Sequence, residues 1–160
     1  MQHLPADVAA MRIALDEATR LTPLGVTPDL PIGAIVLNPE GEVIGRARNQ
    51  REATGDPTAH AEVLALREAA AVIGEWRLTG CTLVVTLEPC PMCAGAAAMS
   101  RVSRVVFGAW NTEYGAAGSH WDLLRDRRMA HRPEVVSGVL EDECGRLVLE
   151  FMSERREEKA

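Results

Sequence analysis

The first half of the chain changes from helical spacing of apolar residues to short continuous apolar runs. Apolar residues at 8–18 recur three and four positions apart, which predicts an amphipathic helix that ends near Arg20. A short apolar run at 31–37 is followed by the turn sequence Asn-Pro-Glu-Gly at 38–41, which leads into residues 42–47. This arrangement predicts a β-hairpin.

A second helix is predicted between Asp56 and Gly74. Asp56 is a favourable N-cap residue, Pro57 is favoured at the first helical position, and the apolar residues of 63–73 give the helix a buried side. His60 would then lie in the first helical turn.

The second half continues the alternation of strands and helices. Residues 82–87 are predicted to form a buried central strand, and Cys90 directly precedes a helix at 91–99. The other predicted segments are a strand (102–107), a glycine-bearing loop (108–119), a short helical stretch (121–124), a last strand (135–140) and a closing helix (141–157). The alternation predicts an α/β layered domain with a central mixed sheet of about five strands.

Length and charge limit the number of domains and the kinds of partner that the chain can have. With 160 residues, 47% of them hydrophobic, residues 1–160 are expected to form a single domain with a substantial core. The formal net charge of −6 argues against a protein whose whole surface binds nucleic acid, so such a partner would have to meet a local basic patch. The candidate patches, which could equally be solvated helix faces, are Arg101 with Arg104, Arg125-Asp126-Arg127-Arg128 with His131-Arg132, and Arg155-Arg156.

The cysteines and the N-terminus indicate a cellular compartment. The four cysteines do not form an evenly spaced disulfide framework, and two of them form a Cys-x-x-Cys, which favours metal or redox chemistry in a reducing cytoplasm. The first twenty residues lack the pattern of a signal peptide, and no apolar run is long enough to span a membrane. We therefore expect a cytoplasmic protein without a membrane segment.

Two short motifs carry the candidate chemistry: His60-Ala61-Glu62 and Pro89-Cys90-Pro91-Met92-Cys93. Catalytic zinc is usually held by three protein ligands with a fourth position left to water, and His60, Cys90 and Cys93 supply three. Glu62 is the candidate general acid and base. His-x-Glu followed by Pro-Cys-x-x-Cys is the known signature of zinc nucleobase deaminases.

The spacing within these motifs places the metal at helix ends. Residues two apart on a helix point roughly 200° away from each other, so His60 and Glu62 can converge only beyond the N-terminus of their helix. Zn²⁺ with two thiolates and one neutral imidazole has no net charge, which leaves it more electrophilic than under four thiolates. The alternative is a closed structural zinc with a fourth ligand from His3, Cys81, His120, His131 or Cys144, although Cys81 and Cys144 are also expected to be small buried hydrophobes.

Longer sequence segments resemble a known family. They are Pro31-Ile32-Gly33-Ala34, Asn49, Asp56–Glu62, Thr86–Ala96, Arg104–Ala109 and Gly115–Ser119. On these residues the chain resembles the cytidine-deaminase-like superfamily and, more closely, the bacterial tRNA-specific adenosine deaminases, over nearly its full length.

The resemblance implies a three-layer α/β/α fold and a homodimer with one zinc per subunit. It further implies hydrolytic deamination of adenosine to inosine at the wobble position of a tRNA anticodon loop, or in another single-stranded nucleic acid. In that scheme Glu62 transfers protons between the attacking water, the ring nitrogen and the departing amine. Asn49 would hydrogen-bond the base.

The loop after Ala109 departs from the family pattern and leaves the substrate open. Asn111-Thr112-Glu113-Tyr114 replaces a usual acidic residue and a Lys-Thr, so a cation has become an anion. Asn111 would remove one repulsion against phosphate, and Tyr114 could stack on a base. Ala130 and Met152 also depart from the family pattern, which has asparagine and phenylalanine at these positions. Two other functions are therefore considered: a deaminase of a free base such as guanine or cytosine, and a non-catalytic, zinc-stabilised RNA-binding partner subunit.

Overall fold

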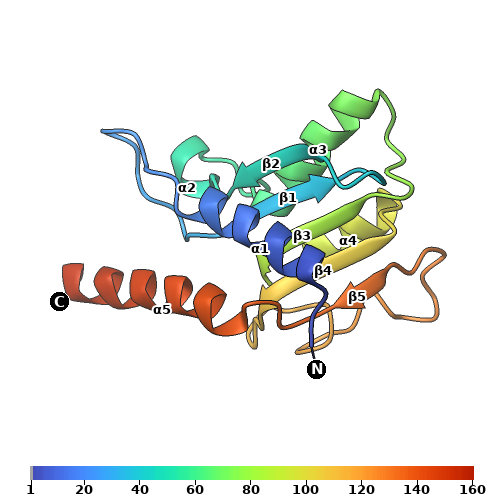
Figure 1. Ribbon diagram of the computed structural model, residues 1–160. Helices are drawn as coiled ribbons and strands as arrows, with labels where there is room; N and C mark the ends of the chain where they lie inside the picture. Colours follow the sequence, from blue (N-terminus) through green and yellow to red (C-terminus); the bar gives the residue numbers. More distant parts are fainter. Residues whose placement is uncertain (1) are drawn as a thin grey trace.

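The computed structural model describes residues 2–160, which form a five-stranded mixed sheet in the order β2-β1-β3-β4-β5 (Figure 1). β1 pairs antiparallel with β2 and β3, whereas β3, β4 and β5 run parallel. In chain order the elements are α1 (Pro5–Ala18), β1 (Gly33–Leu37), β2 (Val43–Arg48), α2 (Arg51–Thr54), α3 (Ala61–Ile73), β3 (Thr82–Leu87), α4 (Pro91–Met99), β4 (Arg104–Ala109), β5 (Glu134–Val136) and α5 (Glu141–Glu158).

Helices cover both faces of the sheet, which gives the three-layer α/β/α arrangement predicted from the sequence. Alternate residues of a strand point to opposite faces. Leu83 and Val85 of β3 accordingly pack with residues of α3 and α4, whereas Val84 packs with residues of α1 and α5. α1 and α5 lie on the same side of the sheet, and α5 extends away from it toward the C-terminus (Figure 1).

Two predicted helical segments differ in the structure. The second helix begins at Ala61 and not at Pro57, because the carboxylate of Asp56 accepts hydrogen bonds at 2.8 Å from both the N–H and the hydroxyl of Thr58 and so closes a turn there. Residues 121–124 are not helical. Asp122 instead forms an isolated bridge with Ala117.

Several strand limits and one short helix also differ from the prediction. The hairpin is confirmed as β1 and β2. β4 spans Arg104–Ala109, where residues 102–107 were predicted, and the last strand spans only Glu134–Val136, where residues 135–140 were predicted. The polar loop before Asp56 contains the short helix α2.

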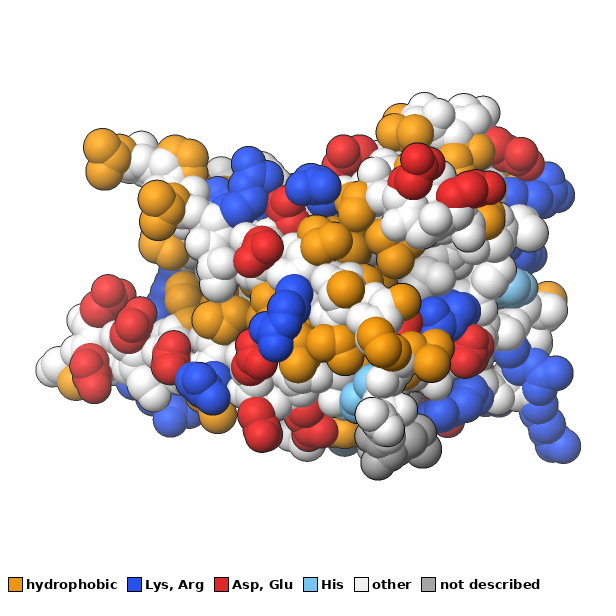
Figure 2. All heavy atoms as spheres, in the orientation of Figure 1, with side chains coloured by type: hydrophobic (Ala, Val, Ile, Leu, Met, Phe, Trp, Pro, Cys, Tyr) orange, Lys and Arg blue, Asp and Glu red, His pale blue; other side chains and the backbone are white. Residues whose placement is uncertain are grey.

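Three arginines of the candidate basic patches are paired with neighbouring carboxylates. Arg104 forms a bidentate ion pair with Asp7 and a second with Glu134, while Arg125 and Arg128 pair with aspartates two or three residues away. On the face shown in Figure 2, acidic and basic side chains are interspersed. None of the described helices is long and apolar enough to cross a membrane.

Candidate metal centre and active site

The structure brings His60, Cys90 and Cys93 together at the N-termini of two neighbouring helices. His60 is the N-cap residue of α3 and Cys90 the N-cap residue of α4, both with extended backbone. Nδ1 of His60 lies 3.7 Å from Sγ of Cys90 and 3.4 Å from Sγ of Cys93. His60 therefore lies directly before the first turn of α3, whereas the sequence predicted it within that turn. Its ring faces both sulfurs.

These distances fit a tetrahedral zinc ion. Zinc binds thiolate sulfur at about 2.3 Å and imidazole nitrogen at about 2.0–2.1 Å, which at a tetrahedral angle separates the two ligand atoms by about 3.6 Å. The observed separations of 3.4 and 3.7 Å lie on either side of this value. The three residues can therefore hold zinc with little rearrangement.

Within residues 2–160, no further residue joins this group of ligands. The ligand atoms of His60, Cys90 and Cys93 lie within 4.8 Å of one another, and none of the five residues considered as a fourth ligand belongs to the group. Cys81 and Cys144 are free, buried thiols, as predicted. A three-ligand site with one open position is the arrangement of catalytic zinc.

The site favours a thiolate at Cys90. The thiol of Cys93 donates to the sulfur of Cys90, and this hydrogen bond, together with the one from His60, lowers the pKa of Cys90 to about 4. The same interaction raises the pKa of Cys93, since its proton is the one that is shared. The hydrogen bond to the Cys90 thiolate also raises the pKa of His60.

Glu62 lies in the first turn of α3, two residues after His60, with its side chain almost fully buried. Burial raises the pKa of Glu62 to about 7, and the neighbouring negative charge of Cys90 acts in the same direction. A bound divalent cation would lower this pKa by its positive charge. Without a bound metal, the carboxyl group of Glu62 can therefore both accept and donate a proton near neutral pH.

Asn49 follows β2 and carries an unpaired polar atom. It is 7% exposed, and its Oδ1 is the one buried side-chain oxygen or nitrogen of the described residues without a hydrogen-bond partner. The next residue, Gln50, donates its N–H to the carbonyl of Ala59 at 2.9 Å, which ties this strand end to the residue before His60. The amide of Asn49 therefore has an unused acceptor on a segment that is bonded directly to the one carrying His60.

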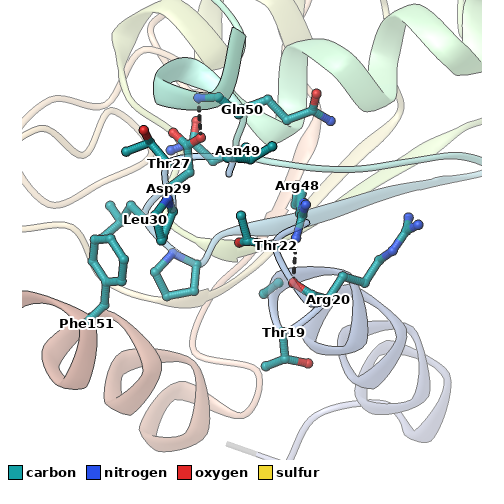
Figure 3. A pocket seen from close by; sticks show the side chains of 15 residues that line it. Thr19, Arg20, Thr22, Thr27, Asp29, Leu30, Arg48, Asn49, Gln50 and Phe151 are labelled. Carbon is teal, nitrogen blue, oxygen red and sulfur yellow. Dashed lines mark hydrogen bonds between the residues drawn. The ribbon is translucent and has the colours of Figure 1, made fainter. Parts of the chain in front are cut away.

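A cavity of about 180 Å³ adjoins Asn49 (Figure 3). Phe151 of α5 and Leu30 lie on one side of it, and Arg48 and Arg20 lie on the other. The loop between α1 and β1 is held there by contacts such as Arg48 Nη1 with the carbonyl of Arg20 at 2.5 Å. None of the three metal-ligand candidates lines this cavity.

Glu88 is a structural residue of the site to which the sequence analysis assigned no role. It is 1% exposed, and its carboxylate accepts backbone N–H groups of Asn111, Ala117 and Ser119, each at 3.0 Å. The adjacent carbonyl of Pro89 accepts the N–H of Ala116 at 2.8 Å. The loop that follows β4 is thereby attached to the turn that carries Cys90. The sequence signal that could have indicated this role is the position of Glu88, a single acidic residue between an apolar strand and Pro89-Cys90.

Asn111 lies at the start of this loop, partly exposed. Its side-chain oxygen accepts the N–H of Tyr114 at 3.1 Å, so this oxygen closes a local turn. The amide NH₂ of Asn111 has no hydrogen-bond partner among the described residues. Only the donor end of this side chain is therefore available to a ligand.

Comparisons with known proteins agree with this geometry. The family model of the cytidine and deoxycytidylate deaminase zinc-binding region matches residues 5–109. The chain is 49% identical to the tRNA-specific adenosine deaminase of Bacillus subtilis, over 96% of this chain and 92% of that protein. It is 48% identical to part of the tRNA(Ile)-lysidine synthase of Deinococcus radiodurans, over 98% of this chain but only 27% of that longer protein.

A similar solved structure comes from a study of A-to-I editing by tRNA:A34 deaminases at the wobble position of transfer RNA. It superposes with a TM-score of 0.79 at 37% identity, and the match covers 87% of this chain and 98% of that chain.

Proposed function

The chain belongs to the zinc-dependent cytidine and deoxycytidylate deaminase family, and we propose that it converts adenosine to inosine at the wobble position of a tRNA anticodon loop. The chain is a hydrolytic deaminase by family. The observation that carries the substrate proposal is its 49% identity, over nearly the whole of both chains, to a tRNA-specific adenosine deaminase.

Each site residue has a proposed role in this reaction. Zinc held by His60, Cys90 and Cys93 would supply the acidified water that hydrolyses the amino group. Glu62 takes one proton from the attacking water and delivers it to the adjacent ring nitrogen of adenine. It then takes the remaining proton of the added hydroxyl group and gives it to the amine, which leaves as ammonia while the C6 carbonyl forms. The raised pKa of its buried carboxyl supports a group that both accepts and donates protons.

Asn49 and Asn111 are proposed to bind the substrate. The unpaired Oδ1 of Asn49 can accept a hydrogen bond from the nucleoside, which would satisfy an otherwise costly buried acceptor. Asn111 can donate its NH₂ group to the nucleic-acid strand without the charge repulsion that an aspartate would bring.

We further propose that residues 1–160 act as one domain in a cytoplasmic homodimer. Support comes from α4, whose outer side combines exposed Met92 and Met99 with Gly95, where a methyl group on the α-carbon would meet no neighbouring element within 4 Å. An apolar helix face of small residues suits close packing against a second helix. Light scattering coupled to size exclusion measures the state, and a monomer at micromolar concentration would refute the dimer.

A deamination assay tests the function. An anticodon stem-loop RNA with a wobble adenosine should yield inosine, whereas free adenine, guanine and cytosine should release little ammonia. Glu62→Gln should retain zinc and lose roughly 10²–10⁴-fold in rate, the range of general acid–base catalysis. Ammonia from a free base without inosine in the RNA would support the free-base alternative. A Glu62→Gln enzyme with full activity would contradict the role of Glu62, and RNA binding without any turnover would favour a non-catalytic subunit.

A further inference from the structure

Exposed aromatic side chains gather on the loop between β4 and β5. Trp110, Tyr114 and Trp121 are 37%, 62% and 48% exposed. The protein has only six aromatic residues of the Phe, Trp and Tyr types, and Trp76 is the one other exposed large aromatic in the described chain, on a different part of the molecule. We name residues 110–121 the aromatic loop.

The aromatic loop is held rigidly. The N–H of Trp121 donates to the carbonyl of Gly115, and the carbonyl of Trp121 accepts the N–H of Gly118, both at 2.9 Å. The hydroxyl of Ser119 donates to the carbonyl of Asn111 at 2.8 Å. Because these contacts and the three N–H bonds to Glu88 fix the backbone, the loop presents its rings with little ordering left to occur on binding.

The individual rings are also supported. Trp110 packs edge-on against Phe107, with ring centroids 4.9 Å apart, and lies against Gly118. His120 and Trp121 contact each other with centroids at 4.2 Å. Tyr114 is the most exposed of the loop's aromatic side chains.

The aromatic loop is continuous with the metal site. Glu88 precedes Cys90 by two residues, and it accepts the N–H of Asn111 at 3.0 Å. The base of the aromatic loop is therefore attached to the turn that carries Cys90, one of the metal-ligand candidates.

The charge of the aromatic loop excludes a mainly ionic contact. Residues 110–121 contain no lysine or arginine, and their one formal charge is the carboxylate of Glu113. Apart from the amide donor of Asn111, phosphate groups would meet no favourable charge here, whereas unstacked bases gain by stacking on aromatic faces.

We propose that the aromatic loop is a stacking platform for the nucleotides that flank the target adenosine in a single-stranded loop. The platform rests on the proposed function, since it assumes a nucleic-acid substrate. Tyr114 and Trp121 each stack on one flanking base. Specificity for the neighbouring sequence is then weak, because every base offers a π face.

The test compares Tyr114→Ala and Trp121→Ala with the matched control Trp76→Ala, which removes a similarly exposed tryptophan elsewhere. Affinity for a fluorescently labelled stem-loop RNA is measured by anisotropy and compared with initial rates of inosine formation. Each platform variant should weaken RNA binding by roughly 5- to 140-fold and raise KM with kcat nearly unchanged, and Trp76→Ala should change neither.

Two further readouts separate stacking from a general structural effect. The loss should be the same factor at low and high salt, because no phosphate contact is removed. It should vanish on a stem-loop whose two flanking nucleotides are abasic. Unchanged melting temperatures would show that the variants fold.

The binding and deamination assays distinguish the platform from the proposed function. If the wild type binds RNA without deaminating it and the platform variants lose this binding, the platform is supported and the proposed function is refuted. Binding unaffected by Tyr114→Ala and Trp121→Ala, or no RNA binding at all, would overturn the platform. A change of oligomeric state in these variants without a change in RNA affinity would also overturn it and would assign the rings to contact with a second copy of the chain.

Discussion

Replacement of Glu88 with glutamine tests whether a buried carboxylate holds the loop beside the metal site. The side chain is 1% exposed and accepts three backbone N–H groups, two on Oε1 and one on Oε2. Glutamine has nearly the same shape but can offer only one oxygen. Its NH₂ group, placed where Oε2 lies, would face the N–H of Asn111 as a second donor.

The expected loss follows from these three bonds. A hydrogen bond to a charged acceptor contributes about 1.5–3 kcal/mol and a neutral one about 0.5–1.5 kcal/mol. Loss of the bond from Asn111 therefore costs about 2 kcal/mol, and weakening of the other two costs about 1 kcal/mol each. The sum of about 4 kcal/mol should lower the melting temperature by roughly 8–16 °C in a chain of this size.

Thermal and denaturant unfolding of the zinc-loaded protein measure this effect. Glu134→Gln is the matched control, because Glu134 is also a hydrogen-bonded carboxylate but its side chain is 62% exposed. The control should lose at most about 1 kcal/mol. A Glu88→Gln protein that melts within about 2 °C of the wild type would refute the reasoning, since that shift corresponds to less than about 1 kcal/mol and the loop would then not depend on the carboxylate.

Two other predictions concern close packing and thiol reactivity. Gly45→Ala would place a methyl group on the backbone of α3 and should destabilise the fold by about 1–3 kcal/mol, whereas Gly145→Ala in α5 brings its methyl group only to an ordinary contact distance of 3.7 Å from Cβ of Ala109 and should stabilise it by about 0.5–1 kcal/mol; equal unfolding midpoints would contradict this. After zinc removal at pH 7, a thiol reagent should modify Cys90 first, because the pKa of Cys90 is lowered to about 4 and its thiolate dominates, whereas the buried Cys93, whose pKa is raised, should react more slowly. Cys144, whose pKa is raised to about 12 by burial, should react only after unfolding, and four fast thiols in the folded protein would contradict the assignment.

Local sequence signals were sufficient for the order and type of most elements. Apolar runs mark β1 and β3 because both strands are buried on two faces, and the proline at the start of α4 marks its first turn. The signal failed where a side chain forms an unexpected local bond. Asp56 favours a helix start by residue type, yet its carboxylate closes a turn with Thr58, and the helix starts later.

The metal-ligand candidates were found from the sequence because their spacing is itself a geometric constraint. A histidine at the start of one helix and two cysteines at the start of the next can converge only at helix N-termini, and the structure brings the ligand atoms of His60, Cys90 and Cys93 together there. The roles of Asn49 and Asn111 remain predictions, supported by an unpaired oxygen at one and a free amide donor at the other.

The sequence by itself predicted the order of most strands and helices, the candidate metal ligands and the acid–base candidate, because each depends on neighbours within a few residues. Tertiary structure alone decided the conformation of the loop after β4, at whose end a helical stretch was predicted. Backbone N–H groups of this loop bond to the carboxylate of Glu88, which lies 23 to 31 residues earlier in the chain. Local propensity cannot register such a distant acceptor. In the loop held in this way, the N–H groups of Trp121 and Leu123 donate to the carbonyls of Gly115 and Ala116, and these bonds outweigh the weak helical preference of so short a segment.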